Sequence, residues 1–528
     1  MSLLESYDVV FAGGGTTACI VAGRLAQADP SLKILIIEAG SHTEDLHNHV
    51  QPARYLNNLG QGHTFSHHNS IPSDALGGRS ICVPTGCCLG GGSAVNFMMY
   101  TRAAASDYDD WEKVGNSGWG SKDLIPLARK VETYQVASGD PSVHGFTGPI
   151  KISGGGQGTN IGREFLEVAA QYDRDRQMLT QSKNDLDAQD FYTVDVYSPW
   201  HMYIDTHTGK RSDTAHHFIY NLNPDSKRNL HILTNRRVVK VLFENNRAVG
   251  VSYAAHDDFN VLGEAKTPPQ TVSGIGSAEH LAKAHVDQLV DLPGVGENYN
   301  DHNLCVTPYL SSEDSDCLDG IFGGDEEAIK PYLAQWTEKG SGLLAHNSID
   351  SGIKLRPTPK ELEELGPSFG QLWQDFYIGA PDKAVLILAS SAGNISSTPS
   401  PPGSKTFSIP YYTLYPRAIG YTHITSGMNP WAPLKFNPGY LEECPHGRRI
   451  LRWGYKRGRA SGPVDIDAPD IVYSAEDDKA IDDHHRATYL SIVPLNVGAN
   501  TYNTALIVGE KAFLLIAKDL GISTKEIV

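Results

Sequence analysis

Three consecutive glycines near the beginning of the chain could hold the phosphates of a nucleotide. They stand between a short apolar run at residues 9–12, typical of a buried strand, and a helical pattern that is clear from residue 19 onward. Gly13 permits a tight turn, and Gly15 lets backbone N–H groups approach a pyrophosphate at the helix N-terminus. Ala18 takes the third position of the motif, where a small side chain allows close packing of helix and strand. The spacing predicts a dinucleotide-binding turn.

An acid follows this turn at the distance that a nucleotide site requires. A second apolar run, residues 34–37, ends in Glu38, which lies 20 residues after Ala18. Strand, glycine turn, helix, strand and acid together form one βαβ unit. The carboxylate is placed to accept hydrogen bonds from a ribose diol, which favours NAD or FAD over NADP. The unit alone leaves an NAD-dependent dehydrogenase and a flavin enzyme both open.

A second glycine-rich stretch argues against the NAD-dependent dehydrogenase. It begins at Gly77 and contains three more consecutive glycines, residues 90–92, followed by Ser93. Apolar residues flank these glycines closely on both sides, which is not typical of a flexible linker. We expect a second close approach of the backbone to the ligand. Neither this block nor the late pair Asn500-Thr501 has an evident role in an NAD-dependent dehydrogenase.

Length and composition limit the remaining classes. The 528 residues are too many for one core, so two or more domains are expected. The net charge of −17 argues against nucleic acid or an anionic membrane as a partner. No apolar run approaches the roughly 20 residues that cross a bilayer. Seven cysteines without a CxxC pair favour a reducing compartment, and the histidines of residues 41–76 match no zinc spacing, so no metal is expected.

Taken with further segments, these motifs resemble the glucose–methanol–choline (GMC) flavin oxidoreductases, and among them the fungal alcohol oxidases. The matching segments are residues 12–15, 78–102, 107–109, 145–150, 292–302 and 496–502. The resemblance implies FAD as the cofactor. It also implies an α/β fold, in which a Rossmann-like FAD-binding domain is interleaved with a substrate-binding domain of antiparallel sheet plus helices.

The resemblance implies five alternating segments. The FAD-binding domain would comprise residues 1–155, 228–310 and 476–528, and the substrate domain residues 156–227 and 311–475. An intracellular location, cytoplasmic or peroxisomal, is expected, because the first strand leaves no room for a signal peptide and the C-terminus is not of the SKL type. A homo-oligomer is suggested by analogy.

The resemblance also assigns the site residues. Cofactor contacts are expected at Gly13, Gly15, Thr16, Ala18, Glu38, Ala39, Gly91, Ser93, Asn96, Phe97, Met98, Val238, Asn500 and Thr501. Val238 would contact the adenine through its backbone, and Phe97 would restrict the pocket to small alcohols, although both could be plain packing residues. Asn500 is the expected catalytic residue, since its amide could donate to the substrate oxygen. An ordinary turn residue is the alternative there.

The activity implied is the oxidation of a primary alcohol to an aldehyde, with O2 reduced to H2O2. A small alcohol and O2 are therefore the expected partners. In the family a histidine from a Trp-His segment serves as base, but here residues 475–488 run directly into Tyr489, which also stands where the family has an aspartate. Loss of a general base costs about 10²- to 10⁴-fold in rate. His484 or His485 could substitute.

Two further junctions are abrupt. Residues 268–276 lack a strand and helix that help form the cofactor sheet in the family, and residues 458–465 skip a helix-bearing part of the substrate domain. We interpret the chain as derived from an alcohol oxidase that has lost internal segments. A catalytically degenerate GMC-like protein, or an oxidoreductase that tailors a secondary metabolite, stays open as an alternative.

Overall fold

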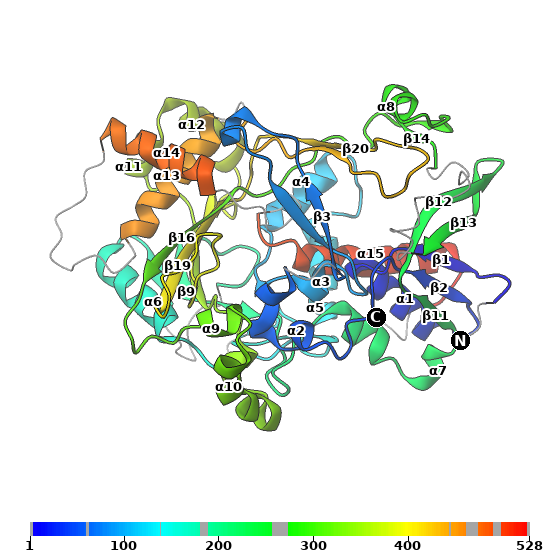
Figure 1. Ribbon diagram of the computed structural model, residues 1–528, viewed down its shortest axis with the longest axis horizontal. Coiled ribbons are helices and arrows are strands. Elements are labelled where there is room, and N and C mark those ends of the chain that lie inside the picture. The colour runs from blue at the N-terminus through cyan, green and yellow to red at the C-terminus, as the bar shows by residue number, and fades with distance from the viewer. Residues whose placement is uncertain are drawn as a thin grey trace.

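The computed structural model describes residues 4–59, 63–137, 139–179, 188–255, 273–442, 445–460, 474–488 and 498–524. Figure 1 shows two groups of elements: a small parallel sheet at the right, beside the N-terminus, and a larger sheet at the left. Within the described ranges, no helix is long and apolar enough to cross a membrane.

The small sheet contains the expected βαβ unit. Its strands are ordered β1 (Val9–Ala12), β2 (Ile34–Ile37) and β11 (Leu230–Leu233), and all run parallel. Every residue of β2 is buried, as expected for the apolar central strand of a parallel sheet. Helix α1 (Thr16–Ala28) connects β1 to β2, and α15 (Tyr502–Asp519) packs against α1. The end of the chain thus closes over its beginning.

The larger sheet is the core of the second unit. Its strand order is β16 (Leu304–Leu310), β19 (Thr406–Thr413), β18 (Leu386–Ser390), β17 (Ser351–Leu355), β9 (Val196–Pro199) and β8 (Gln177–Met178). All its neighbouring strands are antiparallel except β8 and β9. The predicted fold, a Rossmann-like unit interleaved with a domain of antiparallel sheet and helices, is therefore confirmed.

The two faces of the larger sheet pack against different parts of the protein. Leu386 and Leu388 of β18 pack in one core with α6 (Asn160–Tyr172) and α13 (Pro445–Ala460). Ile387, between them, points to the opposite face. There it belongs to a second core that includes residues 98–100, next to the second glycine block. Helices therefore cover one face of this sheet, and the other face meets the nucleotide-binding unit.

Short ladders and helices complete the fold. The ladders pair β3 (Phe65–Asn69) with β4 (Cys82–Gly86), β5 (Met99–Tyr100) with β10 (His201–Met202), β6 (Glu132–Tyr134) with β7 (Ile150–Ile152), β12 (Arg236–Glu244) with β13 (Arg247–Ala255), β14 (Ile275–Gly276) with β15 (Val290–Asp291), and β20 (Tyr421–His423) with β21 (Lys435–Asn437). The other α-helices are α2 (His47–Val50), α3 (Gly92–Val95), α4 (Ala105–Lys113), α5 (Ser121–Val131), α7 (Pro224–Lys227), α8 (Ala278–Lys283), α9 (Asp319–Phe322), α10 (Glu326–Lys339), α11 (Pro359–Leu365), α12 (Pro367–Leu372) and α14 (Ala475–Thr488). Short 3₁₀ or π turns occupy Pro52–Asn58, Asp74–Leu76, His216–Tyr220, Leu343–Ala345 and Trp373–Tyr377.

The strand just before the expected boundary at residue 310 pairs with the larger sheet. β16 pairs with β19 along all seven of its residues, so it lies in the larger sheet rather than in the nucleotide-binding unit. The five-segment division as a whole stays a prediction. Of the three abrupt junctions, Pro268–Val272, Pro463–Asp465 and Tyr489 lie outside the described residues.

Gly23, in the middle of α1, provides a test of this packing. Alanine normally stabilises a helix interior by up to about 1 kcal/mol relative to glycine. A Cβ at Gly23, however, would lie 2.2 Å from the carbonyl oxygen of Phe218. We expect Gly23→Ala to lower the free energy of unfolding by about 1–3 kcal/mol, measured by the thermal midpoint. Gly370→Ala in α12, where nothing lies within 4 Å, is the matched control and should be neutral or stabilising. Equal effects of the two substitutions would contradict the packing described.

Candidate functional site

Direct hydrogen bonds join the two glycine-rich turns. The N–H of Gly90 donates to the carbonyl oxygen of Gly14 at 2.8 Å. The Thr16 hydroxyl donates to the carbonyl oxygen of Gly90 at 3.1 Å and accepts from the N–H of Ser93 at 3.2 Å. Two segments more than 70 residues apart therefore form one continuous backbone surface at the start of α1.

Close backbone approach explains two of these glycines. Gly91 has a φ of +51°, and a Cβ there would lie 2.8 Å from the Cα of Gly15. Gly13, with a φ of +106°, makes the tight turn after β1. The glycines of the second block thus pack on the first turn, and the cofactor contact expected at Gly91 stays a prediction.

The N-terminus of α1 fits a diphosphate. Gly15 caps this helix without a side-chain hydrogen bond, which leaves the first N–H groups of Thr16–Ala18 to a ligand. A Cβ at Gly13 or Gly15 would meet nothing within 4 Å, so open space lies beside the turn. The helix dipole favours negative charge at this end. These features match the pyrophosphate of FAD.

Glu38 holds the adjoining end of β2. It is 7% exposed, and its carboxylate accepts hydrogen bonds from the N–H groups of Gly14 (2.7 Å) in the first glycine turn and Gly40 (2.8 Å), which follows Ala39. Burial raises the pKa of Glu38, although these N–H donors act against the shift. Each carboxylate oxygen keeps one more lone pair for a ribose hydroxyl. A ribose contact can be predicted from the sequence, whereas the two hydrogen bonds from backbone N–H groups to the carboxylate cannot.

The strand that contains Val238, β12, is hydrogen-bonded to Glu38. The N–H of Arg236, the first residue of β12, donates to the carbonyl oxygen of Glu38 at 2.9 Å. Val238 is two residues further along β12 and is half-buried. The first turn, Glu38 and β12 are thereby brought together, and the adenine contact of Val238 stays a prediction.

Arg211 fixes the bend that follows the second glycine block. This side chain is 3% exposed, and its Nη1 donates to both the carbonyl oxygen (2.7 Å) and Oδ1 (2.9 Å) of Asn96. Asn96 Oδ1 also accepts from the N–H of Met98, whose φ is +55°. Burial lowers the pKa of Arg211 to about 10, so the guanidinium stays charged at neutral pH. Nothing in the sequence near Arg211 indicates this role, because the contact joins positions 115 residues apart.

Phe97 lies in this bend and reaches the larger domain. Its ring is half-buried and lies 4.3 Å from the ring of Tyr55, measured between centroids. Its carbonyl oxygen accepts a hydrogen bond from Asn347 Nδ2 at 2.8 Å. Phe97 is thus held between the glycine block and the 343–348 segment, and its predicted place at a pocket wall stays a prediction.

The side-chain amide of Asn500 has a fixed orientation. Its Oδ1 accepts hydrogen bonds from the hydroxyls of Thr101 (2.8 Å) and Tyr412 (2.9 Å). Its backbone N–H donates to the same Thr101 hydroxyl at 2.9 Å. The amide Nδ2 has no hydrogen-bond partner among the described residues, and it is the donor available to a substrate oxygen. Thr501 follows and caps α15.

The loop that carries Asn500 is anchored on both sides. Asp107 Oδ2 accepts from the N–H of Gly498 (3.0 Å) and from the hydroxyl of Tyr415 (3.1 Å), while Lys383 Nζ lies 3.0 Å from Oδ1. His302 Nε2 lies 3.2 Å from the carbonyl oxygen of Ala499. These anchors come from both domains, so the position of Asn500 depends on how the domains meet.

His485 does not reach Asn500. Its Nε2 is hydrogen-bonded to the hydroxyl of Tyr411 at 2.8 Å. Tyr412, the next residue of β19, points to the opposite face of the sheet and contacts Asn500. Burial lowers the pKa of His485 to about 3, which keeps the imidazole neutral. The structure therefore gives no support to the suggestion that His485 replaces the missing base.

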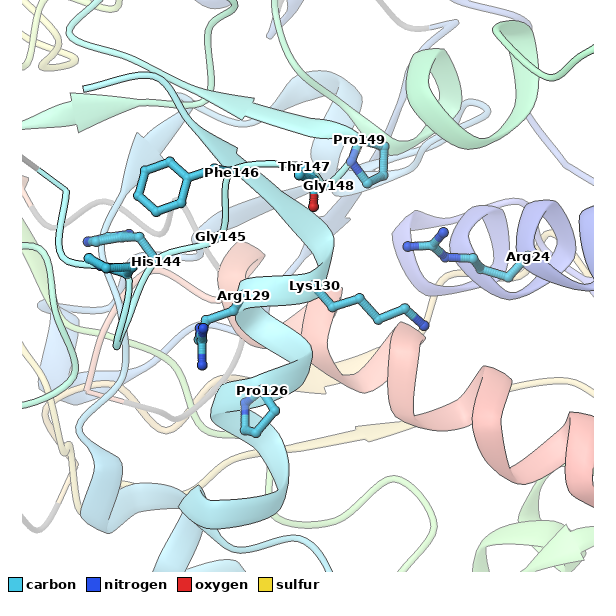
Figure 2. A pocket seen from close by; sticks show the side chains of 11 residues that line it. Arg24, Pro126, Arg129, Lys130, His144, Gly145, Phe146, Thr147, Gly148 and Pro149 are labelled. Atoms are coloured by element: carbon cyan, nitrogen blue, oxygen red, sulfur yellow. The ribbon is translucent and has the colours of Figure 1, made fainter. Parts of the chain in front are cut away.

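A separate cavity of about 530 Å³ lies between α1, α5 and the 141–149 segment (Figure 2). Arg24, Arg129 and Lys130 line it, and Figure 2 shows their side chains coming from α1 and α5. Arg24 and Lys130 both pair with the buried carboxylate of Glu510, at 2.6 and 3.0 Å. Neither the glycine blocks nor Asn500 contribute to the lining, so this cavity is distinct from the nucleotide site.

Comparison with known proteins decides the family. The family model described as GMC oxidoreductase matches residues 7–304. The chain belongs to the GMC oxidoreductases. The alcohol oxidase of Candida boidinii is 32% identical across the whole chain and 97% of its own length. The human mitochondrial choline dehydrogenase is 30% identical over 67% of this chain and 59% of its own.

Solved structures agree on the fold. An FAD-dependent oxidoreductase from Chaetomium thermophilum superposes with a TM-score of 0.77 at 19% identity, covering 98% of this chain and all of that one. Formate oxidase of Aspergillus oryzae gives 0.76 at 18% identity over 97% and 98%. As a GMC member, the chain is an FAD-dependent oxidoreductase of the type that acts on alcohols. The predicted family, fold class and cofactor are confirmed. The individual site contacts stay predictions.

The same comparison bears on the missing segments. The alignment with the Candida enzyme spans 657 positions, which exceeds the 528 residues of this chain by 129. That relative therefore contains stretches without a counterpart here. This agrees with the abrupt junctions recognised in the sequence.

Asp213 and His216 form a buried ion pair next to Arg211. His216 Nδ1 lies 2.7 Å from Asp213 Oδ2. Burial alone would lower the pKa of His216 and raise that of Asp213, but the attraction between them reverses both shifts. The stability that protonated His216 contributes is complete below the ordinary pKa of 6.5 and is lost as the pH rises through the raised pKa of His216 in the folded protein. The stability that ionised Asp213 contributes is lost as the pH falls through the lowered pKa of Asp213.

This pair predicts a pH-dependent stability. We expect His216→Gln to reduce the free energy of unfolding by about 1.5–3 kcal/mol at roughly pH 5.5, where both groups are charged. The difference from the unchanged protein should shrink above neutrality, since His216 then loses its proton. Thermal midpoints across the pH range measure it. The exposed His207→Gln is the control, and a deficit that grows with pH would contradict the pairing.

Proposed function

We propose that this chain uses FAD to oxidise a small primary alcohol to its aldehyde, with O2 as electron acceptor and H2O2 as the second product. The observation that carries this proposal is the oriented amide of Asn500, whose Oδ1 is held by two hydroxyls and whose Nδ2 is available to a substrate. Relatives named alcohol oxidase, similar over the whole chain, support the substrate class.

The oxidising chemistry would come from bound FAD, as the acceptor of a hydride from the carbinol carbon. The residues of the chain bind the cofactor and orient the alcohol. Gly13–Ala18 and Glu38 bind the ADP half of the cofactor, and Gly91 shapes the floor beside it. Asn500 donates a hydrogen bond to the alcohol oxygen and stabilises the negative charge that develops there. Because its Oδ1 is fixed by two hydroxyls, the amide loses no orientation during the reaction.

The ring of Phe97 supports a small substrate. Packed against Tyr55 and tied through its carbonyl oxygen to Asn347, it has little freedom to move aside for a bulky alcohol. An alcohol of one or two carbons fits this proposal best. A larger secondary metabolite is the alternative that a chain-length series excludes or supports.

Oxidation also requires that a base remove the hydroxyl proton of the alcohol. Among the described residues that contact the Asn500 loop, the one imidazole is His302, and both its nitrogens lie near backbone carbonyl oxygens, of Thr413 (2.9 Å) and Ala499 (3.2 Å). Burial lowers the pKa of His302, so this ring does not carry a stable charge. The alcohol therefore loses its proton to water or hydroxide, and Asn500 lowers the cost of the alkoxide.

A second candidate is a GMC-like protein that no longer catalyses. The 129-position excess of the alignment and the absent Trp-His segment favour it. Purified chain incubated with FAD separates the two candidates. Retained flavin absorbance and peroxide formation from methanol or ethanol are expected for the oxidase, whereas a protein that retains no flavin would overturn the proposal.

Asn500→Ala tests the role of the amide. We expect kcat/KM for the alcohol to fall by about 10²- to 10³-fold, because one donor to the developing oxyanion is lost. Flavin absorbance should be retained, which separates this effect from loss of cofactor. Asn116→Ala, on an exposed loop, is the control and should have full activity. Unchanged turnover in Asn500→Ala would assign Asn500 to the turn alone.

The missing base predicts an unusual pH profile. We expect kcat/KM to rise steadily with pH, without the plateau that a histidine base gives, because hydroxide takes the proton. Added imidazole should raise the rate of peroxide formation, since it supplies the absent proton acceptor. A plateau near neutral pH together with no response to imidazole would show that the chain has a base of its own.

A further inference from the structure

Three side chains from separate segments converge at a place remote from the nucleotide site. They are His280 in α8, Glu297 in the loop after β15, and His423 at the end of β20. Glu297 Oε1 lies 2.7 Å from His423 Nε2 and 3.4 Å from His280 Nε2. All three ligand atoms lie within 4.8 Å of one another. Two imidazoles thus face one carboxylate oxygen.

These spacings suit a transition-metal ion. Zinc binds imidazole nitrogen and carboxylate oxygen at about 2.0–2.2 Å, which places tetrahedral ligands roughly 3.3 Å apart. The two distances from Glu297 fall on either side of that value. The histidine rings are stacked, with centroids 3.6 Å apart and planes inclined by 20°. A modest opening of the stack would point both Nε2 lone pairs at one ion.

The hydrogen bonding leaves a place for such an ion. His423 is hydrogen-bonded to Glu297, whereas His280 Nε2 has no hydrogen-bond partner among the described residues. The side chains of His280 and Glu297 are 28% and 36% exposed, so an ion can enter and keep water in a fourth position. Two histidines and one glutamate form a set that binds zinc in many proteins.

His423 is held in place before any ion arrives. The ring of Tyr421 stacks on it at 4.7 Å with an interplanar angle of 13°. The N–H of Thr422 donates to the carbonyl oxygen of Gly296 at 2.7 Å, which joins β20 to the Glu297 loop. We propose that His280, Glu297 and His423 form a binding site for a divalent transition-metal ion of the Zn²⁺ class.

An ion bound at this site would have a structural role. Helix α8 and β14 lie at the margin of the molecule beside β20 (Figure 1). The core that holds α8 is small, with Leu281, Ala284 and Val286 buried and Ile424 against them. An ion held by α8, the Glu297 loop and β20 would link these three segments in the folded state only, and so stabilise them.

Direct titration tests the site. Protein treated with a chelator and then dialysed is titrated with Zn²⁺ alone at neutral pH by calorimetry, and with Co²⁺ followed by its visible spectrum. We expect one ion per chain and a tetrahedral Co²⁺ spectrum. Each of His280→Gln, Glu297→Gln and His423→Gln should weaken binding by at least about 10-fold. His207→Gln, on an exposed turn, is the control and should bind as the unchanged protein does.

Hydrogen exchange gives a second readout that does not depend on catalysis. Zn²⁺ should slow amide exchange in residues 274–298 of the unchanged protein and leave it unaltered in His280→Gln. That variant removes no existing hydrogen bond, so its fold should persist, as the metal-free thermal midpoint verifies. The absence of saturable Zn²⁺ binding, or equal binding by the three variants, would overturn the proposal.

Discussion

The contact between the two glycine turns constrains most of the structure. Gly90 is hydrogen-bonded to Gly14, and the backbone of Gly91 approaches Gly15 so closely that a Cβ on Gly91 would lie 2.8 Å from the Cα of Gly15. One turn begins α1 and the other begins α3, so this contact fixes the nucleotide-binding helix relative to the bend at residues 96–98. Phe97, the proposed wall of the substrate pocket, lies in that bend. In the proposed function, the nucleotide site and the substrate pocket therefore share one piece of backbone.

The larger sheet transmits this constraint to the catalytic amide. Strand alternation sends Tyr411 toward the helical layer and Tyr412 toward the nucleotide-binding unit. Tyr412 then holds the same oxygen of Asn500 that Thr101, just past the bend, also holds. A shift of the sheet by one residue would exchange the two tyrosines and remove this support. The register of β19 is thus a functional constraint as well as a structural one.

Local chemistry could be predicted from the sequence, and distant contacts could not. The βαβ unit, its glycines and Glu38 lie within 30 residues, 9–38, and their order along the chain specifies their geometry. Arg211 holds Asn96 from 115 residues away, and Thr101 holds Asn500 from 399. No periodicity connects such pairs, because they are set by how the domains pack. Residues 280, 297 and 423 meet for the same reason, and their spacing matches no zinc motif.

The support of Asn500 also explains how a shortened chain could keep part of its chemistry. Its partners, Thr101 and Tyr412, and the anchor Asp107 of its loop belong to segments that the abrupt junctions do not interrupt. The proposed function assigns substrate-oxygen binding to Asn500 and proton removal to a base outside the chain. Because a hydrogen bond to the developing alkoxide acts whichever base takes the proton, the amide of Asn500 would still lower the barrier.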